Sequence, residues 1–140
     1  MSSKTIVCDI DDTIIDSRGN GIDKTISFLK AHDAYTIILV TARNESRRSE
    51  TVSQLRELGV SYDRLVMNPG SSAPGAARAY KKDAMQSILR NHDVVLAIDN
   101  SAQARSAYQS LGVKAVHPRS LNSQSISKGG WQGFFNPIGY

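Results

Sequence analysis

The sequence predicts an α/β fold, a three-layer α/β/α Rossmann-like sandwich around a parallel five-stranded sheet. Short apolar runs rich in β-branched residues alternate with segments of helical periodicity along most of the 140 residues. An apolar run of this length is typical of a strand buried on both faces. A helix between successive strands is the usual connection of a parallel sheet. We expect one domain over residues 1–119 and a Gly- and aromatic-rich tail over residues 120–140.

Five short β-rich runs are the expected strands. In chain order they are residues 4–8, 35–40, 65–67, 94–98 and 113–116. Ligands of parallel α/β sheets bind beyond the carboxyl ends of the strands. The polar residues that follow the first, second and fourth runs are therefore the first candidates for a functional site.

Four segments with apolar residues three or four positions apart are the expected helices. They span residues 23–31, 45–58, 81–91 and 101–111. Asp23 is the expected N-cap of the first helix. Gly59 and Gly112 are expected to end the second and fourth, because glycine readily adopts the left-handed conformation found just after helices. Residues 68–79 are rich in Pro, Gly and Ser and are expected to form a bare loop.

Composition and charge narrow the function only slightly. Hydrophobic residues make up 40% and charged residues 21% of the chain, as in ordinary soluble proteins. No run approaches the ~20 apolar residues that span a bilayer, so we expect no membrane partner. Cys8 is the single cysteine, which fits a reducing interior and a cytoplasmic location. The net charge of +4 favours polyanionic partners, but the basic residues are spread along the chain.

The last residues depart from the α/β pattern. Residues 120–140 are too polar and Gly-rich for a core element, yet they carry Trp131, Phe134, Phe135 and Tyr140. We expect an extended tail that docks on another surface, and a homo-oligomer held through this tail is one such arrangement.

Acidic or hydroxyl side chains follow three of the expected strands. Asp9 follows the first strand, Thr41 the second and Asp99 the fourth. Asp9 and Asp11 are two positions apart, so in extended backbone their side chains leave the same face. Carboxylates this close repel unless a cation lies between them. With Asp99 they form an all-oxygen anionic pocket of the kind that binds Mg²⁺.

Such a pocket suits phosphoryl transfer, because the metal offsets charge on the phosphate oxygens. Asp9 is the expected nucleophile, forming an aspartyl-phosphate intermediate. Asp11 is the expected acid/base, which protonates the leaving oxygen and later deprotonates water. Acids after a strand are often only solvated loop residues, but Thr41 and Asp99 in matching positions argue against that interpretation.

Residues 5–117 resemble the haloacid dehalogenase superfamily. Asp9-Ile-Asp11-Asp-Thr13 is similar to its first motif, Asp-x-Asp-x-Thr. Thr41 is similar to the second motif, whose hydroxyl holds the transferring phosphoryl group. Asp99 is similar to the fourth motif, which holds Mg²⁺. The resemblance implies that the metal is held by Asp9, the backbone carbonyl of Asp11 and Asp99.

The third motif of that superfamily is a lysine that neutralises the nucleophile and the phosphate. Lys81 follows an aromatic residue, as in many members, and Lys82 is the alternative. Asn100 stands where the fourth motif has a second aspartate. A neutral amide can still position a metal-bound water, so we expect weaker Mg²⁺ binding rather than loss of activity.

Members of the superfamily differ mainly in cap domains that cover the active site. Neither connection that carries a cap in relatives, here residues 13–22 and 68–79, is long enough to hold one. We therefore expect a capless protein with an open site. An open site suits a large substrate whose own bulk excludes water.

Within the superfamily, residues 37–46 and 92–99 resemble the 3′-phosphatase domain of phage polynucleotide kinase. The resemblance implies that Arg43 grips the phosphate with two hydrogen bonds. The expected substrate-binding set is Thr13, Arg18, Arg43 and Lys82. Ser87 departs from the pattern, because that domain has a lysine there. No Gly-x-x-x-x-Gly-Lys-Ser/Thr loop is present, so no kinase half is expected.

We therefore expect a Mg²⁺-dependent phosphomonoesterase that removes 3′-phosphates from polynucleotide ends. A nucleotide or other small-molecule phosphatase is the alternative of the same class. A non-enzymatic phosphate-binding module in a repair complex is the alternative of another class. The expected partner is thus a phosphorylated nucleic-acid end or a nucleotide.

Overall fold

The computed structural model describes residues 4–70 and 76–122. The aromatic residues of the expected tail lie outside these residues, so its docking stays a prediction. Five parallel strands form one sheet in the order β3-β2-β1-β4-β5. They are β1 (Lys4–Cys8), β2 (Thr36–Asn44), β3 (Arg64–Asn68), β4 (Asp93–Ile98) and β5 (Ala115–Val116).

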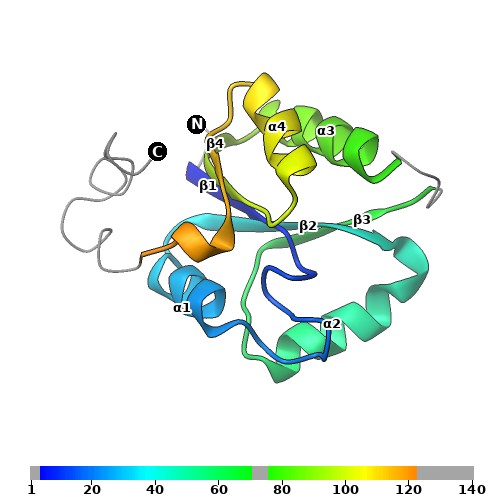
Figure 1. Ribbon diagram of the computed structural model, residues 1–140, viewed down its shortest axis with the longest axis vertical. Helices are drawn as coiled ribbons and strands as arrows, with labels where there is room; N and C mark the ends of the chain where they lie inside the picture. The colour runs from blue at the N-terminus through cyan, green and yellow to red at the C-terminus, as the bar shows by residue number, and fades with distance from the viewer. Residues whose placement is uncertain (1–3, 71–75, 123–140) are drawn as a thin grey trace.

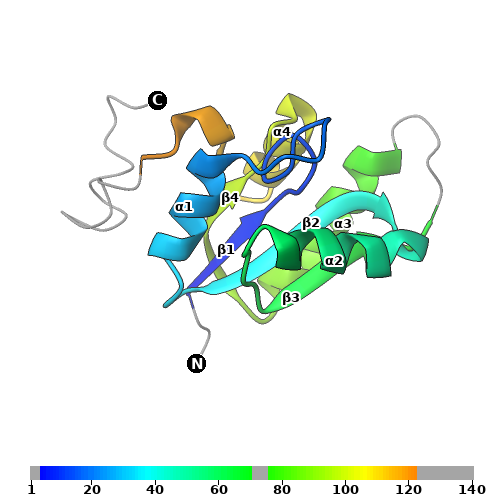
Figure 2. The same cartoon turned by 90° about the horizontal axis from the view of Figure 1, so that it is seen from below.

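Two layers of helices cover the sheet. They are α1 (Asp23–Ala31), α2 (Arg48–Glu57), α3 (Ala76–Leu89) and α4 (Ala102–Ser110). α1 and α2 lie on one face, and α3 and α4 on the other (Figures 1 and 2). Side chains of β1 alternate between the two cores: Ile6 and Cys8 pack on the side of α1, and Val7 packs on the side of α3 and α4. The predicted three-layer α/β/α sandwich is confirmed.

The register of the central strands brings two aspartates together. Cys8 of β1 pairs with Ile98 of β4 at their carboxyl ends. Asp9 and Asp99 therefore leave neighbouring strands at the same level. The strand order also reverses here, because the chain adds β2 and β3 on one side of β1 and β4 and β5 on the other. Such a switch point is where open α/β sheets bind ligands.

The first two helices differ from the prediction, one in its N-cap and the other in being divided. The N-cap of α1 is Ile22, which makes no side-chain cap, and Asp23 lies in the first turn instead. A carboxylate there still favours the helix through the macrodipole. The second expected helix is divided into a 3-10 turn (Glu45–Arg47) and α2. Gly59 and Gly112 both have positive φ, as expected of glycines that end helices.

α3 begins five residues earlier than expected. Residues 76–79 are helical rather than part of a bare loop. Their sequence, Ala-Ala-Arg-Ala, consists of strong helix formers, which the Pro- and Gly-rich stretch before it obscured. Lys81 consequently lies inside the helix rather than at its start.

The described part of the chain contains no cap domain. Residues 13–22 form a tight turn in which the Asp16 carboxylate accepts hydrogen bonds from the backbone N–H groups of Arg18 and Asn20. Only five residues, 71–75, between β3 and α3 lie outside the description. Among the described helices, none combines the length and apolar character needed to cross a membrane.

The packed core extends slightly into the segment expected as a tail. A 3-10 turn (Pro118–Ser120) lies against α1, and Lys24 of α1 donates a hydrogen bond to the carbonyl of Arg119 at 2.8 Å. Leu121 is only 3% exposed and belongs to the same core as Ile6. The fold therefore includes Leu121.

Replacing Leu121 by alanine tests this boundary. We expect Leu121→Ala to lower the free energy of unfolding by about 2–5 kcal/mol, because it removes buried apolar surface and leaves a cavity. Ser120→Ala, an exposed change in the adjacent turn, should alter it by less than about 0.5 kcal/mol. Urea unfolding followed by circular dichroism measures both. Equal stability of the two variants would place the end of the domain before Leu121.

Candidate active site

A cavity of about 260 Å³ opens beyond the carboxyl ends of β1 and β4. The loop after β1 contributes Asp9, Asp11 and Asp12 to its lining. α3 contributes Arg78 and Lys81 from two successive turns. The start of α4 and Asn100 before it close the opposite side. Residues from four distant parts of the chain thus meet at one edge of the sheet.

The floor of this cavity is a buried triad of charges. The ammonium of Lys81 lies 3.0 Å from Oδ1 of Asp9 and 2.6 Å from Oδ2 of Asp99. All three side chains are at most 7% exposed. With both carboxylates ionised the triad carries one net negative charge in a region from which water is largely excluded. A proton or a cation in the cavity would neutralise it.

Burial controls the ionisation of the nucleophile candidate. It raises the pKa of Asp9 to about 7; Lys81 opposes this shift and Asp99 adds to it. For Lys81, burial alone would lower the pKa, but the two carboxylates more than offset it and the pKa is raised. Lys81 therefore remains a cation, and Asp9 exchanges its proton near neutral pH.

Hydrogen bonds fix both carboxylates of the triad. Thr13 Oγ1 donates to Oδ2 of Asp9 at 2.9 Å and accepts from the backbone N–H of Asn100 at 3.2 Å. The backbone N–H of Ser101 donates to Oδ1 of Asp99 at 2.9 Å. Thr13 is fully buried. In this structure Thr13 therefore orients Asp9, and the substrate contact expected from the sequence stays a prediction.

A different cation holds Asp11. The guanidinium of Arg43 meets its carboxylate with two hydrogen bonds, from Nη2 to Oδ1 at 2.8 Å and from Nε to Oδ2 at 3.0 Å. The Asp11 side chain is 52% exposed, whereas that of Arg43 is 5% exposed. Asp9 and Asp11 thus have different side-chain cations, Lys81 and Arg43, and a Mg²⁺ ion at the Asp-x-Asp motif stays a prediction. The chain turns directly after Asp11, where Asp12 has a φ of 59° in the left-handed region.

Arg43 is itself anchored on α2. Its Nη1 donates to Thr51 Oγ1 at 2.9 Å and to Gln54 Oε1 at 2.7 Å. In this structure Arg43 contacts Asp11, and its expected grip on phosphate stays a prediction. Sequence reasoning missed Thr51 and Gln54, because polar residues on a helix usually face solvent. Their spacing of three, which places them on one helical face, was the available signal.

The remaining predicted site residues differ in whether they line the cavity. Thr41 is fully buried, and its Oγ1 accepts the backbone N–H of Arg43 at 3.1 Å. Asn100 lines the cavity as expected, but Arg18 and Lys82 are not among the lining residues. Arg78 does line it and was missed, because the helix was predicted to begin only at residue 81.

The oxygen donors of the site fit Mg²⁺ in kind. Among residues 4–70 and 76–122, no three His, Cys, Asp or Glu side chains converge as a metal cage. Two carboxylates do converge, those of Asp9 and Asp99, with the Asn100 amide nearby. Mg²⁺ is commonly bound through one or two carboxylates, with waters and substrate phosphate completing its shell. A metal at this place would compete with the Lys81 ammonium for the same oxygens.

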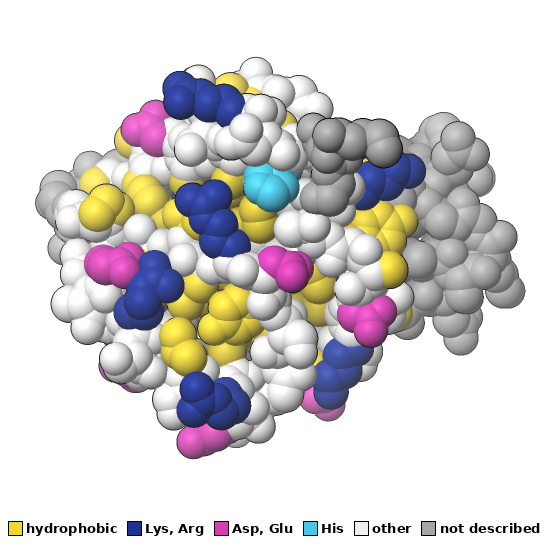
Figure 3. Space-filling model, turned by 180° about the vertical axis from the view of Figure 1, so that it is seen from behind, with side chains coloured by type: hydrophobic (Ala, Val, Ile, Leu, Met, Phe, Trp, Pro, Cys, Tyr) yellow, Lys and Arg dark blue, Asp and Glu magenta, His cyan; other side chains and the backbone are white. Residues whose placement is uncertain are grey.

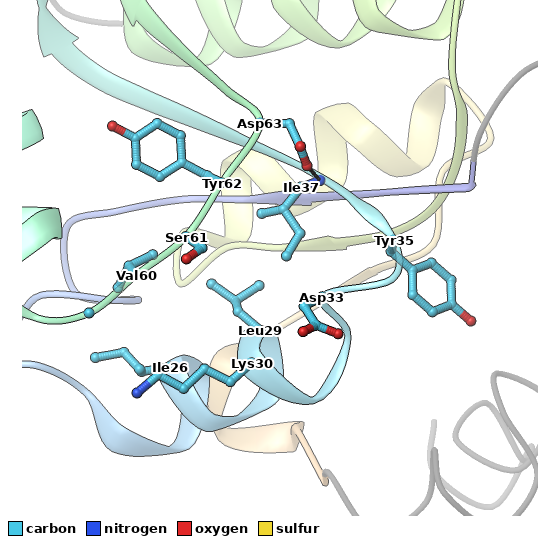
Figure 4. Close-up of a pocket in the computed structure, with 11 residues that line it drawn as sticks. Ile26, Leu29, Lys30, Asp33, Tyr35, Ile37, Val60, Ser61, Tyr62 and Asp63 are labelled. Carbon is cyan, nitrogen blue, oxygen red and sulfur yellow. Dashed lines mark hydrogen bonds between the residues drawn. The ribbon is translucent and has the colours of Figure 1, made fainter.

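A second cavity of similar size lies at the opposite edge of the sheet. It measures about 250 Å³, and Ile26 and Leu29 of α1 face Ile37 of β2 and Val60 across it (Figure 4). Asp63 on its wall accepts the backbone N–H of Ile37 at 2.8 Å. This apolar cavity offers no paired nucleophile and acid. On the face opposite to that of Figure 1, basic and acidic side chains are interspersed rather than gathered into one patch (Figure 3).

Comparisons with known proteins support the fold. No protein-family model matches the sequence, and no curated protein matches it. A chain of the Pnkp1/Rnl/Hen1 RNA repair complex has a TM-score of 0.73 at 19% identity, over 83% of this chain and 42% of that chain. A chain from another structure of the Pnkp1/Rnl/Hen1 complex gives 0.72 at 19% identity, over 83% and 46%. The chain thus spans less than half the length of these two structural neighbours.

A third similar structure belongs to a protein of different chemistry. UDP-GlcNAc 2-epimerase from Neisseria meningitidis has a TM-score of 0.54 at 14% identity, over 97% of this chain and 37% of that chain. At such identities the likeness shows the architecture alone. The function has to be argued from the site.

The raised pKa of Asp9 predicts a pH-dependent stability in metal-free protein. The unfolded carboxyl loses its proton near pH 3.8 and the folded one near pH 7. Between these values only the folded state holds the proton, so the free energy of unfolding should fall as pH rises, by up to about 1.4 kcal/mol per pH unit. Asp9→Asn should remove this dependence and be the more stable protein at pH 8 in chelator.

Urea unfolding at several pH values between 4 and 8 measures this effect. Asp33→Asn, an exposed change beside the second cavity, should keep the wild-type pH dependence. An Asp9→Asn protein that is less stable than wild type at pH 8 would show that ionised Asp9 stabilises the fold.

Proposed function

We propose that the protein is a Mg²⁺-dependent phosphomonoesterase of the haloacid dehalogenase type that removes 3′-phosphates from polynucleotide ends. One observation carries the proposal: two neighbouring carboxylates have opposite surroundings. Asp9 is buried against Lys81, and Asp11 is half-exposed against Arg43. Carboxylates placed in different environments commonly divide the roles of nucleophile and acid/base.

In the first step Asp9 attacks phosphorus. Its carboxylate oxygen forms a bond to phosphorus while the bond from phosphorus to the 3′-oxygen breaks, which gives an aspartyl-phosphate. Asp11 transfers its proton to the departing oxygen. Lys81 offsets the negative charge of the nucleophile, and the Thr13 hydroxyl holds one carboxylate oxygen so that the other can turn toward the substrate.

In the second step water releases the phosphate. Asp11, now ionised, takes a proton from a water molecule whose oxygen bonds to phosphorus as the bond to Asp9 breaks. Inorganic phosphate leaves and both aspartates regain their starting forms. The half-exposed Asp11 side chain is suited to this task because it has access to water, whereas Asp9 is buried.

Mg²⁺ would be held by Asp9, Asp99, the backbone carbonyl of Asp11 and Asn100, and would offset the charge on the phosphate oxygens. In the absence of a cation, the negative triad would repel an incoming phosphate. This charge balance supports a requirement for a cation such as Mg²⁺.

Three features support a polynucleotide end as the substrate. The cavity, at about 260 Å³, is smaller than the roughly 300–1,000 Å³ typical of sites that enclose a small ligand. No cap closes it within the described residues, so the substrate itself has to exclude water. The likeness to chains of an RNA repair complex supports the same substrate class. A small-molecule phosphatase and a non-enzymatic phosphate-binding module are the outcomes that an assay separates.

Phosphate release from a 3′-phosphorylated oligonucleotide tests the proposal. We expect release that requires Mg²⁺ and is lowered at least about a thousandfold by Asp9→Asn, because the nucleophile is lost. Asp33→Asn is the matched control and should keep wild-type activity. Faster release from 3′- or 5′-mononucleotides would favour the small-molecule reading. Binding without any release would leave only the phosphate-binding module.

Arg43→Lys tests whether Arg43 acts through Asp11. Lysine keeps the charge but cannot form the two-pronged contact. We expect kcat on the 3′-phosphorylated oligonucleotide to fall about 10–100-fold, because its sugar oxygen needs a proton to leave. Release from p-nitrophenyl phosphate should fall less than about threefold, since its leaving group departs without a proton. An equal loss on both substrates would mean that Arg43 contacts the phosphate itself.

A further inference from the structure

The cationic side chains nearest the proposed reaction centre already form ion pairs with carboxylates. Lys81 contacts Asp9 and Asp99, and Arg43 contacts Asp11. Asp12 adds a further exposed acid to the cavity lining. The cavity is therefore acidic overall, and a polyanionic strand that enters it needs a cation that these acids do not occupy.

Arg78 is a cation of this kind. It lines the same cavity, is exposed and makes no ion pair within the described residues. It precedes Lys81 by three residues on α3, so the two side chains share one face of the helix. Lys81 is buried at the floor of the cavity, whereas Arg78 lies one turn, about 5 Å, nearer the start of α3, where the helix is exposed.

The two cations lie in the order in which two successive phosphates of a strand would meet them, one at the floor of the cavity and one toward the exposed start of α3. A terminal phosphate under attack by Asp9 lies next to Lys81 at the floor. The next phosphate of the strand is one nucleotide away and has to lie outside a cavity of this size. The backbone N–H groups of the first turn of α3 add partial positive charge on the same side.

We propose that Arg78 binds the phosphodiester adjacent to the terminal phosphate and thereby makes the site selective for a strand over a mononucleotide. This inference rests on the proposed function, because it takes the terminal phosphate to lie at Asp9. Arginine suits the role, since its guanidinium can donate two parallel hydrogen bonds to one phosphate. Arg78 is then a specificity-determining residue and takes no part in the chemical steps.

Binding measurements in an Asp9→Asn background test the inference without turnover. The affinity for a fluorescent 3′-phosphorylated oligonucleotide is measured by anisotropy, and that for a 3′-phosphorylated mononucleotide by competition. We expect Arg78→Ala to weaken oligonucleotide binding about tenfold. The ratio of oligonucleotide to mononucleotide affinity should fall at least about fivefold. The slope of log K against log salt should fall by about 0.7, the value for one lost phosphate contact on a single strand.

Arg90→Ala is the matched control, because Arg90 is an exposed arginine just beyond the far end of the same helix. It removes the same charge and should leave the affinity ratio and the salt slope unchanged. Equal weakening of both ligands by Arg78→Ala would place Arg78 on the terminal phosphate and overturn the inference. If Arg78→Ala and Arg90→Ala had equal effects, the loss of affinity would come from the lower net charge of the protein. That result would also overturn the inference.

Failure of the proposed function gives a different result. If wild-type protein releases no phosphate from any substrate but Arg78→Ala still lowers the affinity ratio, the protein is a strand-binding module and Arg78 keeps its role. If wild-type protein is an active phosphatase and the ratio is unchanged, the phosphatase proposal stands and the role of Arg78 is wrong.

Discussion

The buried contact of Lys81 with Asp9 and Asp99 is the interaction on which the site depends. The Lys81 ammonium contacts both carboxylates and offsets one of their two charges, which makes three charged side chains at most 7% exposed tolerable. The contact joins α3 to the carboxyl ends of β1 and β4. It also holds the proposed nucleophile in place, because a carboxylate held by an ammonium and a hydroxyl has little freedom to turn away.

The two helical layers supply different cations or anchors to the two acids of the site. α3 brings Lys81 to Asp9 from one face of the sheet, and α2 anchors Arg43 against Asp11 from the other. The two adjacent acids thereby acquire separate partners and separate degrees of exposure. The proposed phosphatase mechanism rests on this division, because it needs one carboxylate to attack and another to move protons.

Likeness of fold leaves the chemistry open. The same architecture occurs in chains of an RNA repair complex and in a sugar-nucleotide epimerase. The chemistry of this chain has to be argued from the side chains at the carboxyl edge of its sheet. The small open cavity, its acidic lining and the exposed Arg78 at its side together favour an extended anionic ligand over an enclosed one.

The sequence by itself determined the strands, their parallel arrangement and the meeting of Asp9 and Asp99 at one edge, because strand periodicity is a local property and the carboxyl ends of parallel strands meet at one edge. Lys81 was also predictable, through its resemblance to a motif. Only the tertiary structure decided which cation meets which acid. The partnership of Arg43 with Asp11, the support from Thr51 and Gln54, and the place of Arg78 all depend on how α2 and α3 pack on the sheet. Such contacts join residues that are distant in the chain, so no periodic pattern in the sequence indicates them.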